Sequence, residues 1–289
     1  MNRIALGTVQ FGLPYGVANK TGQVTQLAAK TILKLAKENG TDTLDTAIAY
    51  GESEACLGEV GVHDFKVVTK IPAVPDDCID VCNWVQEQVN ESLARLGVSS
   101  VYGLLLHDSL QLLEKDGKAL YRSLKKLKAT GQVQKIGVSI CSPKELELLT
   151  PYFDFDLVQA PFNIFDRRLS DSGWLYRLKV MDVEVHVRSA FLQGLLLIPR
   201  NKVPEKFVPW NELFNSWHEW LSYNSVSAIQ VCLAYALSFP EIDRVIVGVD
   251  SVKQLQQIIN VTEIIVPNGF PDLHCEDENL INPACWPQL

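Results

Sequence analysis

Short apolar runs alternate along the chain with longer segments whose apolar residues recur at helical spacing. This alternation is typical of βα units joined in a parallel sheet. It predicts strands at residues 4–6, 43–45, 66–69, 101–106, 135–139, 157–160, 184–188 and 244–247. Helices are predicted at residues 25–39, 53–60, 80–96, 116–130, 143–150, 172–181, 211–238 (interrupted near Asn224) and 251–260. The order favours an α/β fold, a single closed (β/α)8 TIM barrel.

The ends of several predicted helices carry recognisable signals. Gly40, Gly97 and Gly131 are typical of helix ends, because glycine readily adopts the left-handed conformation that follows a last turn. Ser142-Pro143 predicts an N-cap followed by proline at the first helical position. An open doubly wound sheet is the weaker alternative, since it would need a nucleotide-binding fingerprint and the sequence has neither G-x-G-x-x-G nor a P-loop.

The length of the chain suits one domain. Its 289 residues, 47% of them hydrophobic, are ordinary for a single barrel. We expect a barrel domain over residues 1–265 and an irregular, proline-containing C-terminal tail over residues 266–289 that packs on it. Residues 192–210 also interrupt the repeat and predict a long loop after the seventh strand, of the kind that is often functional.

Charge and cysteine content argue against several functions. The net charge of −8, an isoelectric point near 5.2 and scattered basic residues disfavour nucleic-acid binding. No apolar stretch approaches the roughly 18 residues that span a bilayer, and the first residues lack a signal-peptide pattern. The seven cysteines form no C-x-x-C pair, which favours reduced thiols over disulfides, and Cys78 and Cys82 lack further ligands for zinc. We expect a cytoplasmic protein without metal, membrane or nucleic-acid partner, whose oligomeric state stays open.

Polar residues follow several predicted strands where each apolar run ends. Asp45, Lys70 and His107 occupy such positions, and Tyr50 follows Asp45 in the same loop. The carboxyl ends of barrel strands meet at one face, where barrels of this kind build active sites. Taken singly, Asp45 suits an N-terminal cap or a salt bridge at the barrel end, and Lys70 a solvated strand end. His107 alone suits a satisfied core histidine, and Tyr50 a packed loop aromatic. Together they predict a pocket that delivers a proton to a carbonyl oxygen while a hydride arrives at its carbon.

Ordered segments of the sequence resemble the aldo-keto reductase superfamily over nearly all of residues 3–265. They are Leu6-Gly7-Thr8, Phe11-Gly12, Leu44-Asp45-Thr46-Ala47, Tyr50-Gly51, Val68-Thr69-Lys70, Leu106-His107, Gly137-Val138-Ser139 and Gln159. The resemblance implies an NAD(P)-dependent oxidoreductase in which Tyr50 is the general acid. Free tyrosine has a pKa near 10, and a neighbouring lysine cation stabilises the tyrosinate form. Lys70 would supply that cation, Asp45 would orient it, and His107 would donate a hydrogen bond to the substrate carbonyl.

The resemblance also implies residues that hold the cofactor. Ser139 and Gln159 match positions that bind the nicotinamide carboxamide, although Ile140 stands where many members have asparagine. Arg188, before Ser189, replaces an aromatic residue that commonly stacks on the nicotinamide, and a guanidinium plane can also stack. The remaining positions are Phe191, Gln193 and Gly194 near the pyrophosphate, and Gly248, Asp250 and Gln254 near the adenine end.

The expected cofactor is NADP or NAD, with an open preference. Members that bind NADP place lysine or arginine near the 2′-phosphate, whereas this chain has Gly248 and Gln254 there and Lys253 as the nearest cation. Asp250 would repel a phosphate, accept a hydrogen bond from a ribose hydroxyl, or merely cap a helix. We expect both cofactors to bind with less than about tenfold discrimination.

Substrate contacts are nominated from loops expected at the barrel mouth: Tyr15, Asp108, Asn163, Arg167 and Trp286. Their mixed polarity suits a small hydroxylated carbonyl compound, such as a sugar or sugar derivative. The segments at residues 10–20 and 280–283 are also similar to bacterial members associated with surface-sugar metabolism. Two other functions stay open: a lyase in which Lys70 forms a Schiff base, and a regulatory protein that binds the cofactor without turnover.

Overall fold

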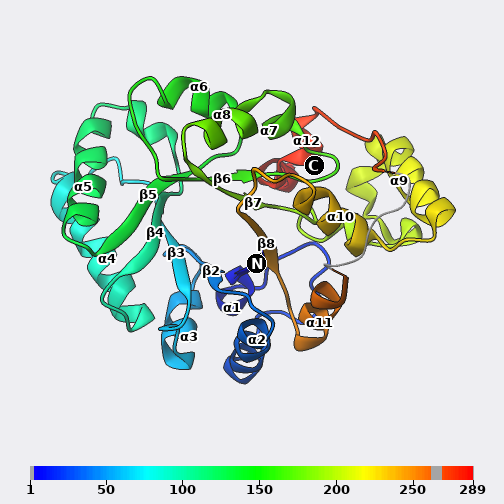
Figure 1. Cartoon of the computed structure of the whole chain (residues 1–289), viewed down its shortest axis with the longest axis horizontal. Coiled ribbons are helices and arrows are strands. Elements are labelled where there is room, and N and C mark those ends of the chain that lie inside the picture. The colour runs from blue at the N-terminus through cyan, green and yellow to red at the C-terminus, as the bar shows by residue number, and fades with distance from the viewer. Residues whose placement is uncertain (1–2, 262–268, 289) are drawn as a thin grey trace.

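The computed structural model describes residues 3–261 and 269–288. Parallel strands form a closed barrel in sequence order, with helices around it, as Figure 1 shows, and this confirms the predicted (β/α)8 fold. The strands are β1 (Ile4–Gly7), β2 (Thr43–Asp45), β3 (Lys66–Ile71), β4 (Val101–Leu106), β5 (Val133–Ser139), β6 (Leu157–Pro161), β7 (Glu184–Arg188) and β8 (Arg244–Gly248). The pairing of β1 with β8, Ile4 opposite Val245, closes the barrel.

The helices follow the predicted pattern with bounds shifted by one or two residues. They are α1 (Val9–Gly12), α2 (Gln26–Glu38), α3 (Ser53–Val60), α4 (Val81–Leu96), α5 (Gly117–Ala129), α6 (Lys144–Leu149), α7 (Arg168–Asp171), α8 (Trp174–Val180), α9 (Asn211–Asn224), α10 (Ala228–Leu237), α11 (Val252–Val261) and α12 (Glu278–Ile281). The sequence did not predict α1, α7 or α12, since a four-residue helix is too short to show a period.

Local signals explain where the helices begin and end. In α2, Ala29, Ile32, Leu33 and Ala36 are buried at i, i+3, i+4 and i+7, so one stripe faces the barrel. Gly97, which follows α4, is left-handed with φ 66°. The interruption predicted near Asn224 is also present, because α9 ends there and a capping box built on Ser227 starts α10.

The long loop predicted at residues 192–210 folds into short 3-10 turns. These are η2 (Leu195–Leu197), η3 (Arg200–Lys202) and η4 (Glu205–Trp210), in addition to η1 (Leu110–Leu113) and η5 (Pro283–Gln288) elsewhere. Proline residues fix the backbone here, since Pro199 and Pro204 precede two of the turns. The loop therefore has an ordered backbone at the carboxyl end of β7.

Alternation along the strands directs the polar residues into the barrel. Val68, Leu105 and Leu157 pack together as a cluster separate from the main core between strands and helices. Side chains in a strand alternate between its two faces. The residues two positions further along β3, β4 and β6 therefore point to the same interior, one layer nearer the carboxyl end. They are Lys70, His107 and Gln159.

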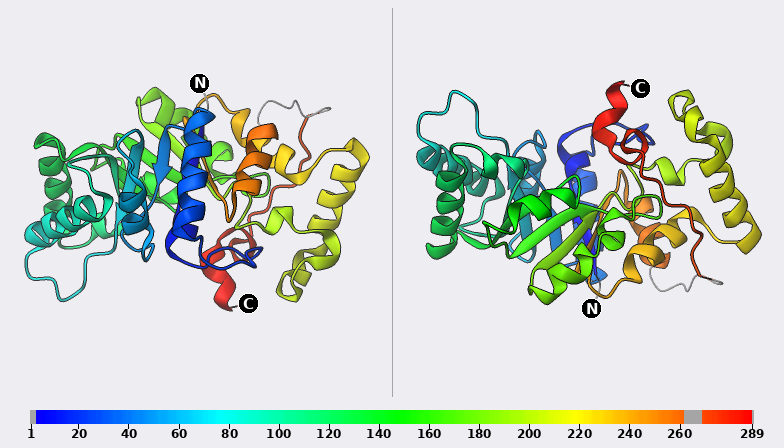
Figure 2. Two further views of the ribbon diagram at one scale, coloured as in Figure 1. Left: turned by 90° about the horizontal axis from the view of Figure 1, so that it is seen from below. Right: turned by 90° about the horizontal axis from the view of Figure 1, so that it is seen from above.

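The described part of the C-terminal tail packs on the barrel end that carries these residues. Trp286 is 4% exposed and contacts Phe207, with ring centroids 4.9 Å apart, and the amide of Cys275 donates to the carbonyl of Phe165 (2.8 Å). Figure 2 shows the two termini at opposite ends of the barrel. The expected boundary between residues 265 and 266 lies outside the described residues. Within those that are described, no helix is long and apolar enough to cross a bilayer.

Candidate active site

Lys70 is the centre of a buried polar cluster at the carboxyl end of the barrel. Its ammonium group donates to both carboxylate oxygens of Asp45 (2.8 Å each), to the carbonyl of Thr46 (2.8 Å) and to the hydroxyl of Tyr50 (3.5 Å). Lys70 is 1% exposed, so the alternative of a solvated strand end does not hold. Because a lysine ammonium has three hydrogens, these contacts use its donors in full.

The surroundings of Lys70 keep it charged. Burial, the largest influence, lowers its pKa, but the Asp45 carboxylate and the Tyr50 hydroxyl together outweigh burial and raise the pKa above its ordinary value. Asp45 is held in turn by the side-chain amide of Gln159, which donates to Oδ1 over 2.6 Å. The hydroxyl of Ser139 donates to the other end of that amide (3.3 Å). The cluster thus fixes one cation beside the hydroxyl of Tyr50.

Two glycines set the position of Tyr50. The Tyr50 backbone amide donates to Ala47, and its carbonyl accepts from Ser53, each over 3.0 Å. A Cβ at Gly12 would lie 1.8 Å from the carbonyl oxygen of Tyr50, and Gly51 has a left-handed φ of 54°. The loop after β2 therefore packs backbone against backbone on α1, and only glycine permits this approach.

His107 lies beside Tyr50, with ring centroids 5.9 Å apart and an interplanar angle of 79°. Its side chain lines the cavity at this barrel end and is still accessible to solvent, but the walls of the cavity partly desolvate it. This desolvation, followed by the positive charges of Lys70 and Arg188, lowers the pKa of His107 to about 4. The neutral ring still carries one N–H, so it can donate a hydrogen bond to a carbonyl oxygen without adding a charge.

We predict that His107 stays neutral down to about pH 5. The C2 proton resonance of His107, assigned by its loss in His107→Gln, should titrate with a midpoint near 4 in NMR spectra. Since this folded pKa lies below the unfolded value of about 6.5, the contribution of His107 to stability should fall as pH drops from 6.5 toward 4. A titration midpoint above 6 would show that the cavity and its positive charges do not lower the pKa of His107.

A cavity of about 610 Å³ opens at this barrel end, within the range of small-molecule sites. Asp45, Tyr50 and His107 line it, while Lys70 lies behind them. Tyr15 lines it too, as does every residue expected at the cofactor: Ser139, Gln159, Arg188, Ser189, Phe191, Gln193, Gly194, Gly248, Asp250 and Gln254. The cavity extends from the strand ends to Gln257 and Ile258 in α11. Elements that are far apart in the chain therefore contribute to one continuous cavity wall.

Arg188 has no carboxylate partner among the described residues. Its guanidinium donates to the carbonyl of Ile140 (2.9 Å) and lies 3.8 Å from the sulfur of Cys141. Among the described residues, Arg188 therefore forms no ion pair with an acidic residue at the barrel mouth. The side chain is instead anchored on the backbone after β5, at the position that the resemblance gives to the ring stacked on nicotinamide.

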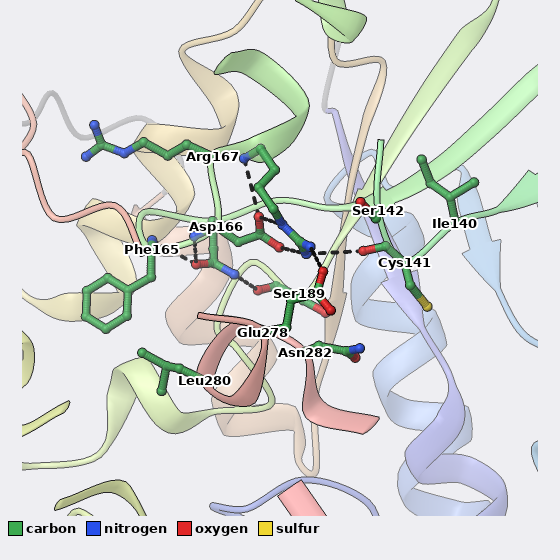
Figure 3. A network of polar contacts seen from close by, with 12 residues as sticks. Ile140, Cys141, Ser142, Phe165, Asp166, Arg167, Ser189, Glu278, Leu280 and Asn282 are labelled. Atoms are coloured by element: carbon green, nitrogen blue, oxygen red, sulfur yellow. Dashed lines mark hydrogen bonds and ion pairs between the residues drawn. The ribbon is translucent and has the colours of Figure 1, made fainter. Parts of the chain in front are cut away.

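The remaining nominated substrate residues lie outside the cavity wall. Asn163 is fully buried, and its side chain accepts from the amides of Phe165 (2.9 Å) and Asp166 (3.0 Å) and donates to the carbonyl of Ser189 (3.0 Å). Figure 3 shows the polar network to which it belongs. Arg168 continues this network from Asp166 to Glu278 in the tail. Asn163 therefore fixes one loop to another rather than facing a ligand.

Arg167, Trp286 and Asp108 also have structural contacts. Arg167 donates to the carbonyl of Ile164 (3.1 Å) and to Asp272 (3.2 Å), which ties α7 to the tail. Trp286 donates to the carbonyl of Leu280 (3.0 Å), and Asp108 accepts from the amide of Leu110 (3.1 Å). These loop residues hold the loops in place, and their position in the sequence did not distinguish this role from contact with a ligand.

Sequence reasoning did not single out several residues of the cavity wall. Thr8 follows β1, Gln10 lies in α1, Cys141 follows β5, and Asn282 comes from the tail. Two signals were present, since Thr8 lies in the Leu6-Gly7-Thr8 segment and Asn282 in the Leu280 to Pro283 segment. Gln10 lies at the start of the 10–20 segment that resembles bacterial members, but nothing in the sequence indicates that its side chain is buried.

Comparison with known proteins identifies the family. The model of the aldo/keto reductase family matches residues 3–268. The chain belongs to the aldo/keto reductase family. This confirms the resemblance seen in the sequence, and it places the chain in a family of NAD(P)-dependent oxidoreductases whose expected site residues meet here at one barrel end.

Relatives of this aldo/keto reductase are distant in sequence. It is 24% identical to the aldo-keto reductase YhdN of Bacillus subtilis over 59% of this chain and only 53% of that protein. It is 23% identical to the NADH-specific methylglyoxal reductase of Escherichia coli over 91% of this chain and 90% of that protein. The holo form of aldo-keto reductase AKR11C1 from Bacillus halodurans shares the fold, with a TM-score of 0.75, 19% identity and coverage of 91% and 87%.

Proposed function

We propose that this aldo/keto reductase transfers a hydride between a nicotinamide dinucleotide and a carbonyl or alcohol substrate, with Tyr50 as the proton donor. One observation carries the proposal: Tyr50 lines the cavity, and its hydroxyl lies 3.5 Å from the ammonium group of the buried Lys70. A cation at that distance favours the negative charge that a tyrosine gains when it gives up its proton. The arrangement suits proton traffic to a carbonyl oxygen in the cavity.

The other residues support this proton transfer. His107, neutral and beside Tyr50, donates a hydrogen bond to the same carbonyl oxygen and orients it. Lys70 acts through its charge, and Asp45 is a positioning residue that keeps this cation in place. The nicotinamide, when bound, supplies or takes up the hydride.

The cavity wall fits a dinucleotide over its length. Ser139 and Gln159 lie beside the catalytic cluster, where the resemblance puts the carboxamide, and Arg188 lies next to them. Gly194, with a left-handed φ of 89°, allows the loop after β7 to approach a pyrophosphate closely. Gly248, Asp250 and Gln254 line the part of the cavity to which the resemblance assigns the adenine end. The hydroxyl of Tyr15 and the amide of Asn282 add polar groups, which suits a small hydroxylated substrate such as a sugar derivative.

Two other functions are less well supported. A Schiff-base lyase needs Lys70 as a free amine, yet its donors are all engaged and its pKa is raised. A regulatory protein without turnover would not need the four residues in contact. The seven free thiols suit a reducing compartment such as the cytoplasm.

A binding and turnover experiment tests the proposal. We expect NADH or NADPH to bind with a dissociation constant below about 1 mM, and a panel of aldehydes and aldoses to oxidise the bound cofactor. Cofactor binding without turnover of any substrate would favour the regulatory alternative. A borohydride-stable adduct on Lys70 would favour the lyase.

A further inference from the structure

The adenine end of the cavity contains no positive side chain. Among the described residues that line the cavity, Arg188 alone is a permanent cation, and it is anchored at the nicotinamide end on the carbonyl of Ile140. Lys253 is exposed and absent from the wall. The residues that the structure does not describe include no lysine or arginine. A 2′-phosphate, which carries close to two negative charges, would find no charge-assisted partner from these side chains.

Two backbone amides around the start of α11 are bound by side chains of the same segment. The side-chain Oε1 atom of Gln254 accepts from the backbone amide of Asp250 (2.6 Å). The backbone amide of Gln254 donates to the hydroxyl of Ser251 (3.3 Å). The amides at a helix start would otherwise form a generic phosphate site. Gln254 stands where the family often has a cation, and its side chain binds the backbone amide of Asp250 instead.

Asp250 places a carboxylate in the same wall. Its Oδ1 atom accepts from the side-chain amide of Asn19 (3.2 Å), and its Oδ2 atom accepts from the side-chain amide of Gln254 (3.4 Å). These contacts join the loop after β1 to the loop after β8. They hold an acceptor, and a negative charge, at the edge where the adenosine would lie.

Gln10 adds a second acceptor nearby. Its side chain is 9% exposed and lines the cavity, and its Oε1 atom has no hydrogen-bond partner among the described residues. The same side chain fills the space beside Gly248, where a Cβ would lie 2.4 Å from Nε2 of Gln10. A buried oxygen without a donor is costly, so this position favours a ligand with hydroxyl groups.

We infer that the protein binds NADH in preference to NADPH, because this end of the cavity offers acceptors for ribose hydroxyls and no cation for a 2′-phosphate. The inference rests on the proposed function for the orientation of the cofactor. It replaces the discrimination of less than about tenfold that was expected from the sequence. The expected preference is at least tenfold in dissociation constant.

Calorimetric titration of the whole protein at one ionic strength tests the inference. NADH should bind at least tenfold more tightly than NADPH, and ADP-ribose more tightly than 2′-phospho-ADP-ribose. The second pair lacks the nicotinamide ring, so it reports on the adenine end without reference to catalysis. The difference in affinity within each pair should decrease as salt is added, since Asp250 is only partly buried and salt screens its repulsion of the phosphate.

Matched variants identify the residues responsible. Asp250→Asn keeps the shape of the side chain and removes its charge. It should reduce the preference for NADH, measured as the ratio of the NADPH and NADH dissociation constants, at least threefold. Gln10→Met should weaken the binding of NADH severalfold more than the binding of NADPH. Asp77→Asn changes an exposed aspartate in the loop after β3 and should leave both dissociation constants within about twofold, which controls for net charge.

Three outcomes would overturn the inference. NADPH binding as tightly as NADH, or more tightly, contradicts the preference while leaving the proposed function intact. An unchanged ratio in both Asp250→Asn and Gln10→Met contradicts the assignment of residues. If neither cofactor binds below about 1 mM, the proposed function fails as well.

Discussion

Replacing Tyr50 with phenylalanine should lower kcat for carbonyl reduction by a factor of 10² to 10⁴, the usual contribution of a general acid. The change removes one hydroxyl from a side chain that lies beside Lys70 and His107 and lines the cavity. Cofactor binding should be retained, because the residues proposed to hold the dinucleotide lie on other strands and loops. Steady-state kinetics together with cofactor titration separate the two effects.

The matched control is Tyr152→Phe, which removes a hydroxyl from a tyrosine that is 74% exposed. It should leave kcat and cofactor affinity unchanged. If Tyr50→Phe retained kcat within about threefold of the parent, another group would have to deliver the proton. A loss of cofactor affinity as large as the loss of kcat would instead indicate that the loop after β2 had moved.

The barrel and the position of the buried polar cluster were predictable from the sequence for the same physical reason. Apolar runs mark the strands, and alternation directs every second residue of each run into the interior. Lys70 and His107 lie two positions beyond Val68 and Leu105, which pack together inside the barrel. A polar residue at such a position is aimed at the carboxyl end by the strand itself, so its location follows from local pattern alone.

Loop residues were not predictable in this way. Asn163 and Arg167 follow strand β6 as His107 follows β4, yet they bind backbone carbonyls and amides and the tail. Their direction depends on contacts with chain segments more than 20 residues away, which no local pattern encodes. Gln10 was missed for the same reason, since its burial depends on Gly248, which lies beside it where β8 pairs with β1.

Lys70→Met should suppress turnover at least as strongly as Tyr50→Phe, and it should also destabilise the fold. The substitution leaves the Asp45 carboxylate buried without its cation, and breaking a buried ion pair in this way typically costs about 3–5 kcal/mol. Urea denaturation measures that loss. A low rate in this variant alone would therefore not distinguish a missing charge from a disturbed fold.

The double variant Asp45→Asn/Lys70→Met separates the two explanations. It removes both charges, so much of the stability should return, while the hydroxyl of Tyr50 still lacks a neighbouring cation. We expect urea midpoints closer to the parent, turnover that stays low, and alcohol oxidation whose pH profile moves to higher pH, because tyrosinate would form less readily without the cation. Recovery of turnover together with stability would show that Lys70 serves the fold and that its charge plays no part in the proton transfer.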